Sequence, residues 1–399
     1  MRAAFFVLAW LGVSATAVAQ VLPAEPMTFG GGRVVIGGEV NAAIAPDDPG
    51  FFNYSDYEHS TLREFRLGLS AAVRANDRVS LLAEIRTENF QDVKPFAFYV
   101  RVRPWREKRF DIQFGRIPPT FGSFARYAYG KSNPLIGYPL AYQYLTSLRA
   151  DSIPADADEL LRMRGRGWLS NFSIGNLAPA RGLPLVTAFS WDTGIQVSTG
   201  WRIVDVTAAI TNGSASNPRV DDDNDGKQIS TRVTVRPAFG LVLGGSYARG
   251  QFGQRSLVDA LPTESDRRFI QQAIGADAEY SRDHWAVRFE GVISEWRIPA
   301  INAPFVPRSL RAFSPRLEGR YTFLPGLYGA ARIDYLGFNR IAGAQRVAEW
   351  DAPVTRLEVG GGYYLQRNLV ARIAVQMNRR DGGRVRTSTL PAFQLLYWF

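Results

Sequence analysis

The chain contains no cysteine, only two histidines, and only four lysines among its 47 basic residues. Without thiols it forms no disulfide bond and no thiolate metal site, so its stability must come from burial and hydrogen bonding. Two histidines leave little material for imidazole chemistry. Beyond residue 20, no segment approaches about 18 consecutive apolar residues, which excludes a transmembrane helix.

The N-terminus has the three parts of a secretory signal. Arg2 supplies the positive charge, residues 3–13 are apolar, and Ala17-Val18-Ala19 precedes Gln20 as a cleavage site. The apolar run is too short for a membrane anchor. We therefore expect a signal peptide over 1–19, a short periplasmic segment over 20–32, and an exported mature chain.

Basic residues exceed acidic ones, giving a formal charge of +10. Such a balance can indicate nucleic-acid binding. Here the arginines alternate with acids along strand-like segments of an exported chain, so no nucleic-acid partner is expected. Hydrophobic residues make up 46% of the chain and are dispersed, with 37 glycines between them.

The main pattern is an alternation of apolar and polar residues with a period of two, typical of β-strands. In residues 63–74, Phe65, Leu67 and Leu69 alternate with Glu64 and Arg66. The runs that show this pattern are 33–44, 61–74, 79–88, 96–103, 109–116, 193–201, 203–212, 227–236, 240–250, 270–281, 284–296, 315–323, 327–338, 355–365, 369–379 and 390–399.

The connections between these runs alternate between short turns and long segments rich in Gly, Pro, Asp and Asn. This asymmetry predicts an all-β fold: a transmembrane antiparallel β-barrel over 33–399 with about 16 strands, short periplasmic turns and long extracellular loops. A soluble β-sandwich or secreted barrel also alternates, but it rarely repeats the pattern so often with such loop asymmetry. The longest loop is 117–192.

The last ten residues alternate and end on an aromatic residue, with Phe393, Leu395, Tyr397 and Phe399 on one face. This resembles the C-terminal signature of Gram-negative outer-membrane proteins, and the whole pattern resembles 16-stranded porins. The resemblance implies the cell outer membrane as location, a homotrimer, and a third loop folded into the lumen. It also implies membrane lipid, lipopolysaccharide and the outer-membrane assembly machinery as partners.

Residues 115–122 look like the strand-to-loop junction of phosphate-selective (O/P-type) porins. Those porins depend on lysines and arginines in the eyelet, whereas this chain is poor in lysine. Phosphate specificity therefore does not follow from the resemblance.

If the apolar side chains face lipid, the alternating charged ones face the lumen. The wall residues expected to line the pore are Arg66, Arg86, Arg101, Arg288, Arg320, Arg332, Glu84, Glu290 and Glu318, and the loop residues expected at a constriction are Arg126, Lys131, Arg149, Arg162, Arg164 and Arg166. In an extended segment the last three share one face. They would attract anions in a lumen, or contact acidic lipopolysaccharide on an exterior loop.

Asp221, Asp223, Asp225 and Gly226 resemble the start of a calcium loop. Arg232 stands where that loop needs a bidentate Glu, which favours a polar turn over a metal site. No G-x-S-x-G or zinc spacing accompanies His59 or His284, so we expect neither an enzyme nor a cofactor. The predicted function is passive diffusion of small polar or anionic solutes; the alternative is a surface enzyme or binding barrel with an occluded lumen.

Overall fold

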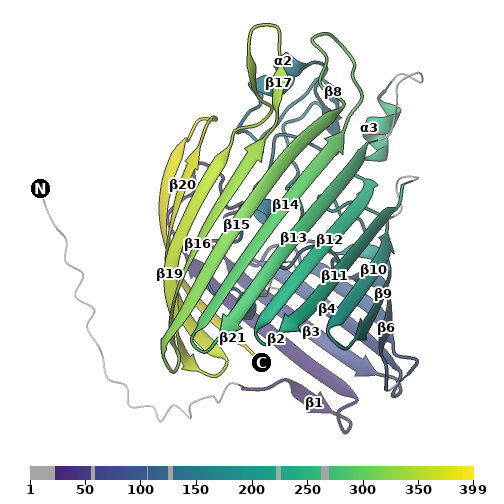
Figure 1. Ribbon diagram of the computed structural model, residues 1–399, viewed down its shortest axis with the longest axis vertical. Coiled ribbons are helices and arrows are strands. Elements are labelled where there is room, and N and C mark those ends of the chain that lie inside the picture. Colours follow the sequence, from purple (N-terminus) through teal and green to yellow (C-terminus); the bar gives the residue numbers. More distant parts are fainter. Residues whose placement is uncertain (1–22, 55–58, 106, 125–128, 222–225, 262–268) are drawn as a thin grey trace, which may run out of the picture.

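Sixteen long antiparallel strands form a closed barrel in the computed structural model, which describes residues 23–54, 59–105, 107–124, 129–221, 226–261 and 269–399 (Figure 1). The strands are β2 (Val34–Ile44), β3 (Phe65–Arg74), β4 (Val79–Glu88), β5 (Lys94–Val102), β6 (Arg109–Ile117), β9 (Asp192–Trp201), β10 (Val204–Thr211), β11 (Gln228–Ala238), β12 (Leu241–Gln251), β13 (Ile270–Arg282), β14 (Trp285–Arg297), β15 (Ser309–Leu324), β16 (Leu327–Phe338), β19 (Val354–Gln366), β20 (Leu369–Arg380) and β21 (Thr387–Trp398). The predicted signal peptide lies outside the described residues.

Each strand pairs with its neighbour in sequence, and the first pairs with the last. Glu39 of β2 lies opposite Trp398 of β21, and Ile44 lies opposite Phe393. Closure leaves no unpaired edge, which a β-structure needs in hydrocarbon because no water is present to satisfy backbone groups. The predicted fold is therefore confirmed.

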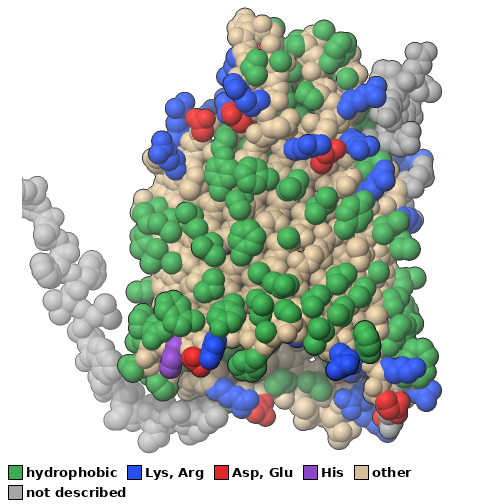
Figure 2. All heavy atoms as spheres, viewed as in Figure 1, with side chains coloured by type: hydrophobic (Ala, Val, Ile, Leu, Met, Phe, Trp, Pro, Cys, Tyr) green, Lys and Arg blue, Asp and Glu red, His purple; other side chains and the backbone are tan. Residues whose placement is uncertain are grey.

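The two faces of the wall differ in chemistry. On β14, Phe289 and Ile293 are 46% and 50% exposed, whereas the intervening Glu290 is 2% exposed. Figure 2 shows the result on one face of the molecule: hydrophobic side chains cover the middle of the wall, and charged ones gather toward its two ends. The apolar set faces outward, as the alternation predicted.

One end of the barrel has tight turns and the other has long loops (Figure 1). The short-turn end includes positive-φ residues at Arg202, Gly240, Asp283 and Gly326, which let two-residue hairpins close without splaying the strands. Aromatic side chains ring this end, and Trp201 is 75% exposed. This is the girdle expected where a barrel meets a membrane surface.

Strand bounds depart from the sequence prediction mainly at β15, which begins at Ser309 and not near residue 315. Arg297 of β14 pairs with Ser309, and Pro315 sits inside the ladder opposite Gly291. Proline in the run hid the first part of this strand, because a proline ordinarily marks a strand end.

The loops at the other end carry short elements. These are η2 (Gly130–Ser132), α1 (Leu140–Gln143), β7 (Ser152–Ile153), α2 (Ala157–Arg162), β8 (Ile174–Gly175), α3 (Arg255–Asp259), and the hairpin β17 (Arg340–Ala342) with β18 (Val347–Glu349). A further short strand, β1 (Met27–Phe29), pairs with the start of β2 at the short-turn end. In the part of the chain described, no helix has the length and apolarity to cross a bilayer.

Candidate constriction inside the barrel

The long loop between β6 and β9 enters the barrel and contacts inward-facing side chains of the wall. At η2, the Tyr129 hydroxyl donates to Glu84 of β4 at 2.7 Å, and the Gly130 amide donates to Glu39 of β2 at 3.2 Å. Arg372 of β20 donates to the Gly130 carbonyl at 3.0 Å. Three strands thus hold one loop turn through charged side chains.

The next loop residues are held by β16 and β19. Glu358 accepts from the Gly137 amide at 2.8 Å, and Arg332 donates to the Gly137 carbonyl at 2.9 Å. Arg356 donates to the Tyr138 carbonyl at 2.8 Å. Charged side chains here satisfy loop backbone groups that would otherwise be buried without partners.

The same loop also reaches β14. Glu290 accepts from the Tyr142 hydroxyl and the Ser123 amide, both at 2.7 Å, and from Arg316 at 3.0 Å. The hydroxyl of Tyr138 accepts from Arg66 of β3 at 2.8 Å. Because β3 and β14 lie far apart around the ring, residues 129–144 run across the lumen.

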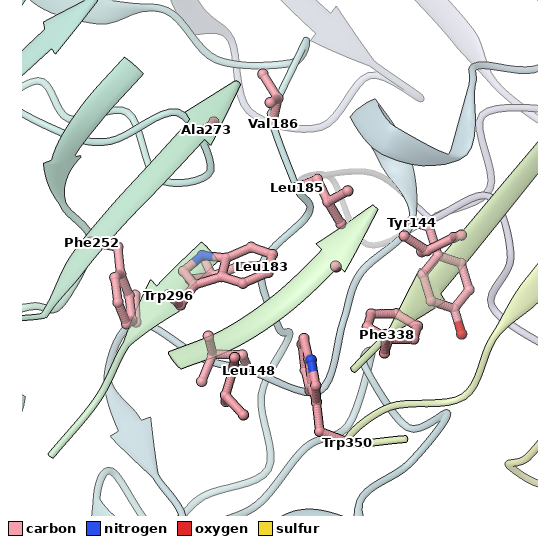
Figure 3. Close-up of a cluster of buried hydrophobic side chains, with 14 of the residues drawn as sticks. Tyr144, Leu148, Leu183, Leu185, Val186, Phe252, Ala273, Trp296, Phe338 and Trp350 are labelled. Atoms are coloured by element: carbon pink, nitrogen blue, oxygen red, sulfur yellow. The ribbon is translucent and has the colours of Figure 1, made fainter. Parts of the chain in front are cut away.

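Beyond these contacts, the loop builds a hydrophobic core at the long-loop end (Figure 3). Leu148, Leu183 and Leu185 pack in one buried cluster with the inward-facing Trp296 of β14. The Trp296 and Trp350 rings meet edge to face, with centroids 5.9 Å apart. This half of the interior is packed like a protein core, a property that the charged alternation of the wall did not predict.

The wall charges form a buried network. Arg332 is fully buried and contacts Glu358 at 2.6 Å, Asp334 at 3.0 Å and Glu318 at 3.4 Å. Glu318 also accepts from Arg288 at 3.0 Å. The planar arginine fork can serve several carboxylates and a carbonyl together, which suits a low-dielectric interior.

The remaining wall arginines expected in the pore also have partners. Arg86 lies over the Phe96 ring, 3.4 Å from its centroid, and pairs with Glu84 at 2.6 Å. Arg320 lies 4.2 Å from the centroid of Tyr328. Arg101 is partly exposed and paired with Asp111.

The loop arginines do not gather at one constriction. Arg149 is 0% exposed and holds Asp151 at 2.8 Å and the carbonyls of Ser170 and Ala178. Its guanidinium binds loop backbone in place of solvent. Lys131 of η2 is exposed, and Arg126 lies outside the described residues.

The three arginines expected on one face lie at the long-loop end. Arg162 ends α2, so the segment is not extended there; Arg164 pairs with Glu349 at 3.4 Å, and Arg166 is exposed. The strand-like spacing failed because Asp156 caps a short helix, accepting from the Glu159 amide. Their role at a constriction stays a prediction.

The sequence predicted Arg101 on the pore wall, but it did not predict the vestibule that Arg101 lines at the short-turn end. Two neighbouring cavities of about 560 and 660 Å³ open beside β3 to β6 and β9 to β11. Seven basic and four acidic residues line them: Arg74, Arg78, Arg101, Arg103, Lys108, Arg109 and Arg236, with Asp77, Glu107, Asp111 and Asp205. The signal was present, because several of these residues flank short turns.

Of the three aspartates in the possible calcium loop, the structure describes only Asp221. Asp221 is exposed, and Asp223 and Asp225 lie outside the described residues. The suggestion of a polar turn there stays a prediction.

Comparison with known proteins establishes the fold. No protein-family model and no curated protein matches the chain. An anion-selective porin from Comamonas acidovorans superposes with a TM-score of 0.55 at 11% identity, covering 92% of this chain and 99% of its own. The channel DcaP of Acinetobacter baumannii gives 0.53 at 10% identity, covering 94% and 100%.

A third structure, in vitro folded OmpT of Vibrio cholerae in its trimer form, gives a TM-score of 0.53 at 11% identity and covers 92% of this chain and 99% of its own. At such identities the likeness carries the barrel architecture and no more. The chain therefore shares its barrel fold with these outer-membrane proteins.

Proposed function

We propose that this chain is an outer-membrane porin through which small polar or anionic solutes diffuse past the inserted loop. The observation that carries the proposal is the run of residues 129–144 across the lumen of a closed barrel. Its outer wall is apolar, and its inner wall is charged. A barrel of this strand number encloses a lumen wide enough for an aqueous path, which an inserted segment then narrows.

Anion preference is proposed to arise at the short-turn vestibule. Its lining has an excess of three positive charges, seven basic against four acidic residues. Such a vestibule raises the local anion concentration at the pore entrance. Arg162, Arg164 and Arg166 take a secondary part in this proposal, because they lie at the opposite end.

The outer surface of the barrel suggests which partners surround it in the outer membrane. The exposed apolar band suits membrane lipid, and the loops at the opposite end from the turns suit contact with lipopolysaccharide. The terminal strand β21 would be read by the outer-membrane assembly machinery after cleavage of residues 1–19. A homotrimer is proposed because the V. cholerae structure is described as a trimer form.

A second candidate is a binding barrel with an occluded lumen. The packed core around Leu148, Leu185 and Trp296 favours it, because that core fills the long-loop half of the interior. A cavity of about 140 Å³ adjoins this core at Tyr144 and is also lined by Trp168 and other loop residues. An occluded barrel would bind ligands there without passing them.

Single-channel recording separates the two candidates. The refolded full-length mature chain is placed in a planar bilayer with a KCl gradient. Small, steady steps whose reversal potential favours chloride support the porin. A correctly folded barrel that stays silent would contradict the porin and support the occluded barrel, and a reversal potential that favours potassium would contradict the anion preference.

A further inference from the structure

Three potential metal ligands converge where the first long loop meets β3 and β4. His59 Nε2 lies 3.1 Å from Glu88 Oε2 and 3.8 Å from Glu64 Oε2. The side chains of Glu64 and Glu88 are 1% and 3% exposed, and that of His59 is 15% exposed. Within the described residues, Glu64 Oε2 has no hydrogen-bond partner. A buried carboxylate oxygen without a donor is costly unless a cation or donor reaches it.

The other oxygens of both carboxylates are fixed by neighbours. Arg66 contacts Glu64 Oε1 at 2.8 Å and Glu88 Oε1 at 2.9 Å, and Asn41 donates to Glu64 Oε1 at 2.9 Å. Each carboxylate therefore turns its Oε2 atom toward His59. Metal sites are commonly organised this way, with supporting donors that orient the ligands.

We propose that His59, Glu64 and Glu88 bind a divalent metal ion of the zinc type. A tetrahedral zinc ion with ligands at about 2.0–2.2 Å separates its donor atoms by about 3.3 Å. The spacings of 3.1 and 3.8 Å bracket that value. The three ligand atoms lie within 4.8 Å of one another. An imidazole with two carboxylates and one open position favours zinc over calcium or magnesium, which prefer oxygen alone.

The competing occupant is a proton. Burial lowers the pKa of His59, but the neighbouring carboxylates of Glu64 and Glu88 outweigh this effect and raise the pKa to about 9. A protonated imidazole can bridge both carboxylates without metal.

Arg66 connects this site to the segment 129–144, which crosses the lumen. Arg66, which holds both carboxylates, also donates to the Tyr138 hydroxyl at 2.8 Å. A metal ion would tie the loop carrying His59 to β3 and β4 beside this contact. The site thus offers a structural clamp at the long-loop end, independent of whether the barrel conducts.

Zinc titration of the refolded mature chain tests the site. The chain has two histidines and no cysteine, so His284→Gln is a matched control for His59→Gln. Calorimetry at pH 7.5 should show one saturable site in the wild type and the His284→Gln variant, weakened at least about tenfold by His59→Gln or Glu64→Gln. Equal binding by His59→Gln and wild type, or no saturable binding, would overturn the proposal.

A second measurement needs no variant. Zinc-edge X-ray absorption of the wild type at one equivalent of zinc should show one imidazole nitrogen and carboxylate oxygens near 2.0–2.2 Å. A shell of oxygens alone would place the ion elsewhere and contradict the site. Because both readouts measure binding, they stay separate from the conductance that tests the porin.

Discussion

Arg332 of β16 donates through Nη2 to the carbonyl oxygen of Gly137 at 2.9 Å, joining the wall to the loop at the middle of the barrel. The same guanidinium is the common partner of Glu318, Asp334 and Glu358. One buried side chain thus fixes the loop backbone and neutralises part of the inner wall.

Replacing Arg332 tests this joint function. Arg332→Met should lower the free energy of unfolding by about 3–5 kcal/mol, because three buried carboxylates lose their shared cation. The freed loop should also widen the path and raise single-channel conductance. Denaturant unfolding in detergent and bilayer recording measure the two effects.

Arg311→Met is the matched control. Arg311 pairs with Glu295 at 2.8 Å, but its side chain is 66% exposed, so its loss should cost under about 1 kcal/mol. Equal stability of the two variants would refute the role given to Arg332.

Gly122 sets the loop geometry near β14. Its φ is +74°, and an added Cβ would collide with the Tyr142 hydroxyl that donates to Glu290. Gly122→Ala should therefore destabilise the barrel by about 1–3 kcal/mol. Gly245→Ala, where a Cβ meets no atom within 4 Å, should leave the unfolding curve unchanged. A wild-type curve for Gly122→Ala would show that this turn does not hold Tyr142.

The absence of native cysteine allows a test of loop exposure. Lys131 is exposed on η2, whereas Ser147 is 0% exposed in the loop core. Lys131→Cys should react with an anionic methanethiosulfonate reagent and lose part of its conductance. Ser147→Cys should neither react nor change. Equal labelling of both positions would mean that the loop core is open to water.

Charge removal in the vestibule should change ion selectivity. The double substitution Arg74→Ser with Arg78→Ser removes two exposed positive charges from the lining and should shift the reversal potential toward cations. Arg162→Ser with Arg166→Ser removes two charges at the other end and should shift it less. A larger shift of the reversal potential in the Arg162→Ser, Arg166→Ser variant would mean that the loop arginines, and not the vestibule, set the ion selectivity.

Most of the barrel was predictable from sequence, because the alternation of apolar and polar residues within each strand shows which side chains face lipid. Phe289 and Glu290 are neighbours in the chain and lie on opposite faces, so a period of two was enough to place them. The predicted range for β15 was too short at its start, because Pro315 lies inside this strand and a proline ordinarily marks a strand end. The positions of the short turns followed from the same alternation.

The interior was not predictable to the same degree, because it depends on contacts between residues far apart in sequence. Arg149 and Lys131 lie in one loop, yet Arg149 is buried and binds loop carbonyls, whereas Lys131 faces solvent. The alternation identified Arg332 as inward-facing but could not show that Gly137 would meet it. The sequence shows no metal-ligand spacing around His59, because Glu88 belongs to β4 and meets the His59 loop only in the folded barrel.

Single-channel conductance of the refolded wild type, recorded beside the Arg332→Met variant, shows whether residues 129–144 narrow an open lumen. We expect small anion-selective steps for the wild type and larger steps for the variant. A silent wild type, or identical steps in both proteins when both are folded, would contradict the claim that the loop held at Gly137 narrows an open channel.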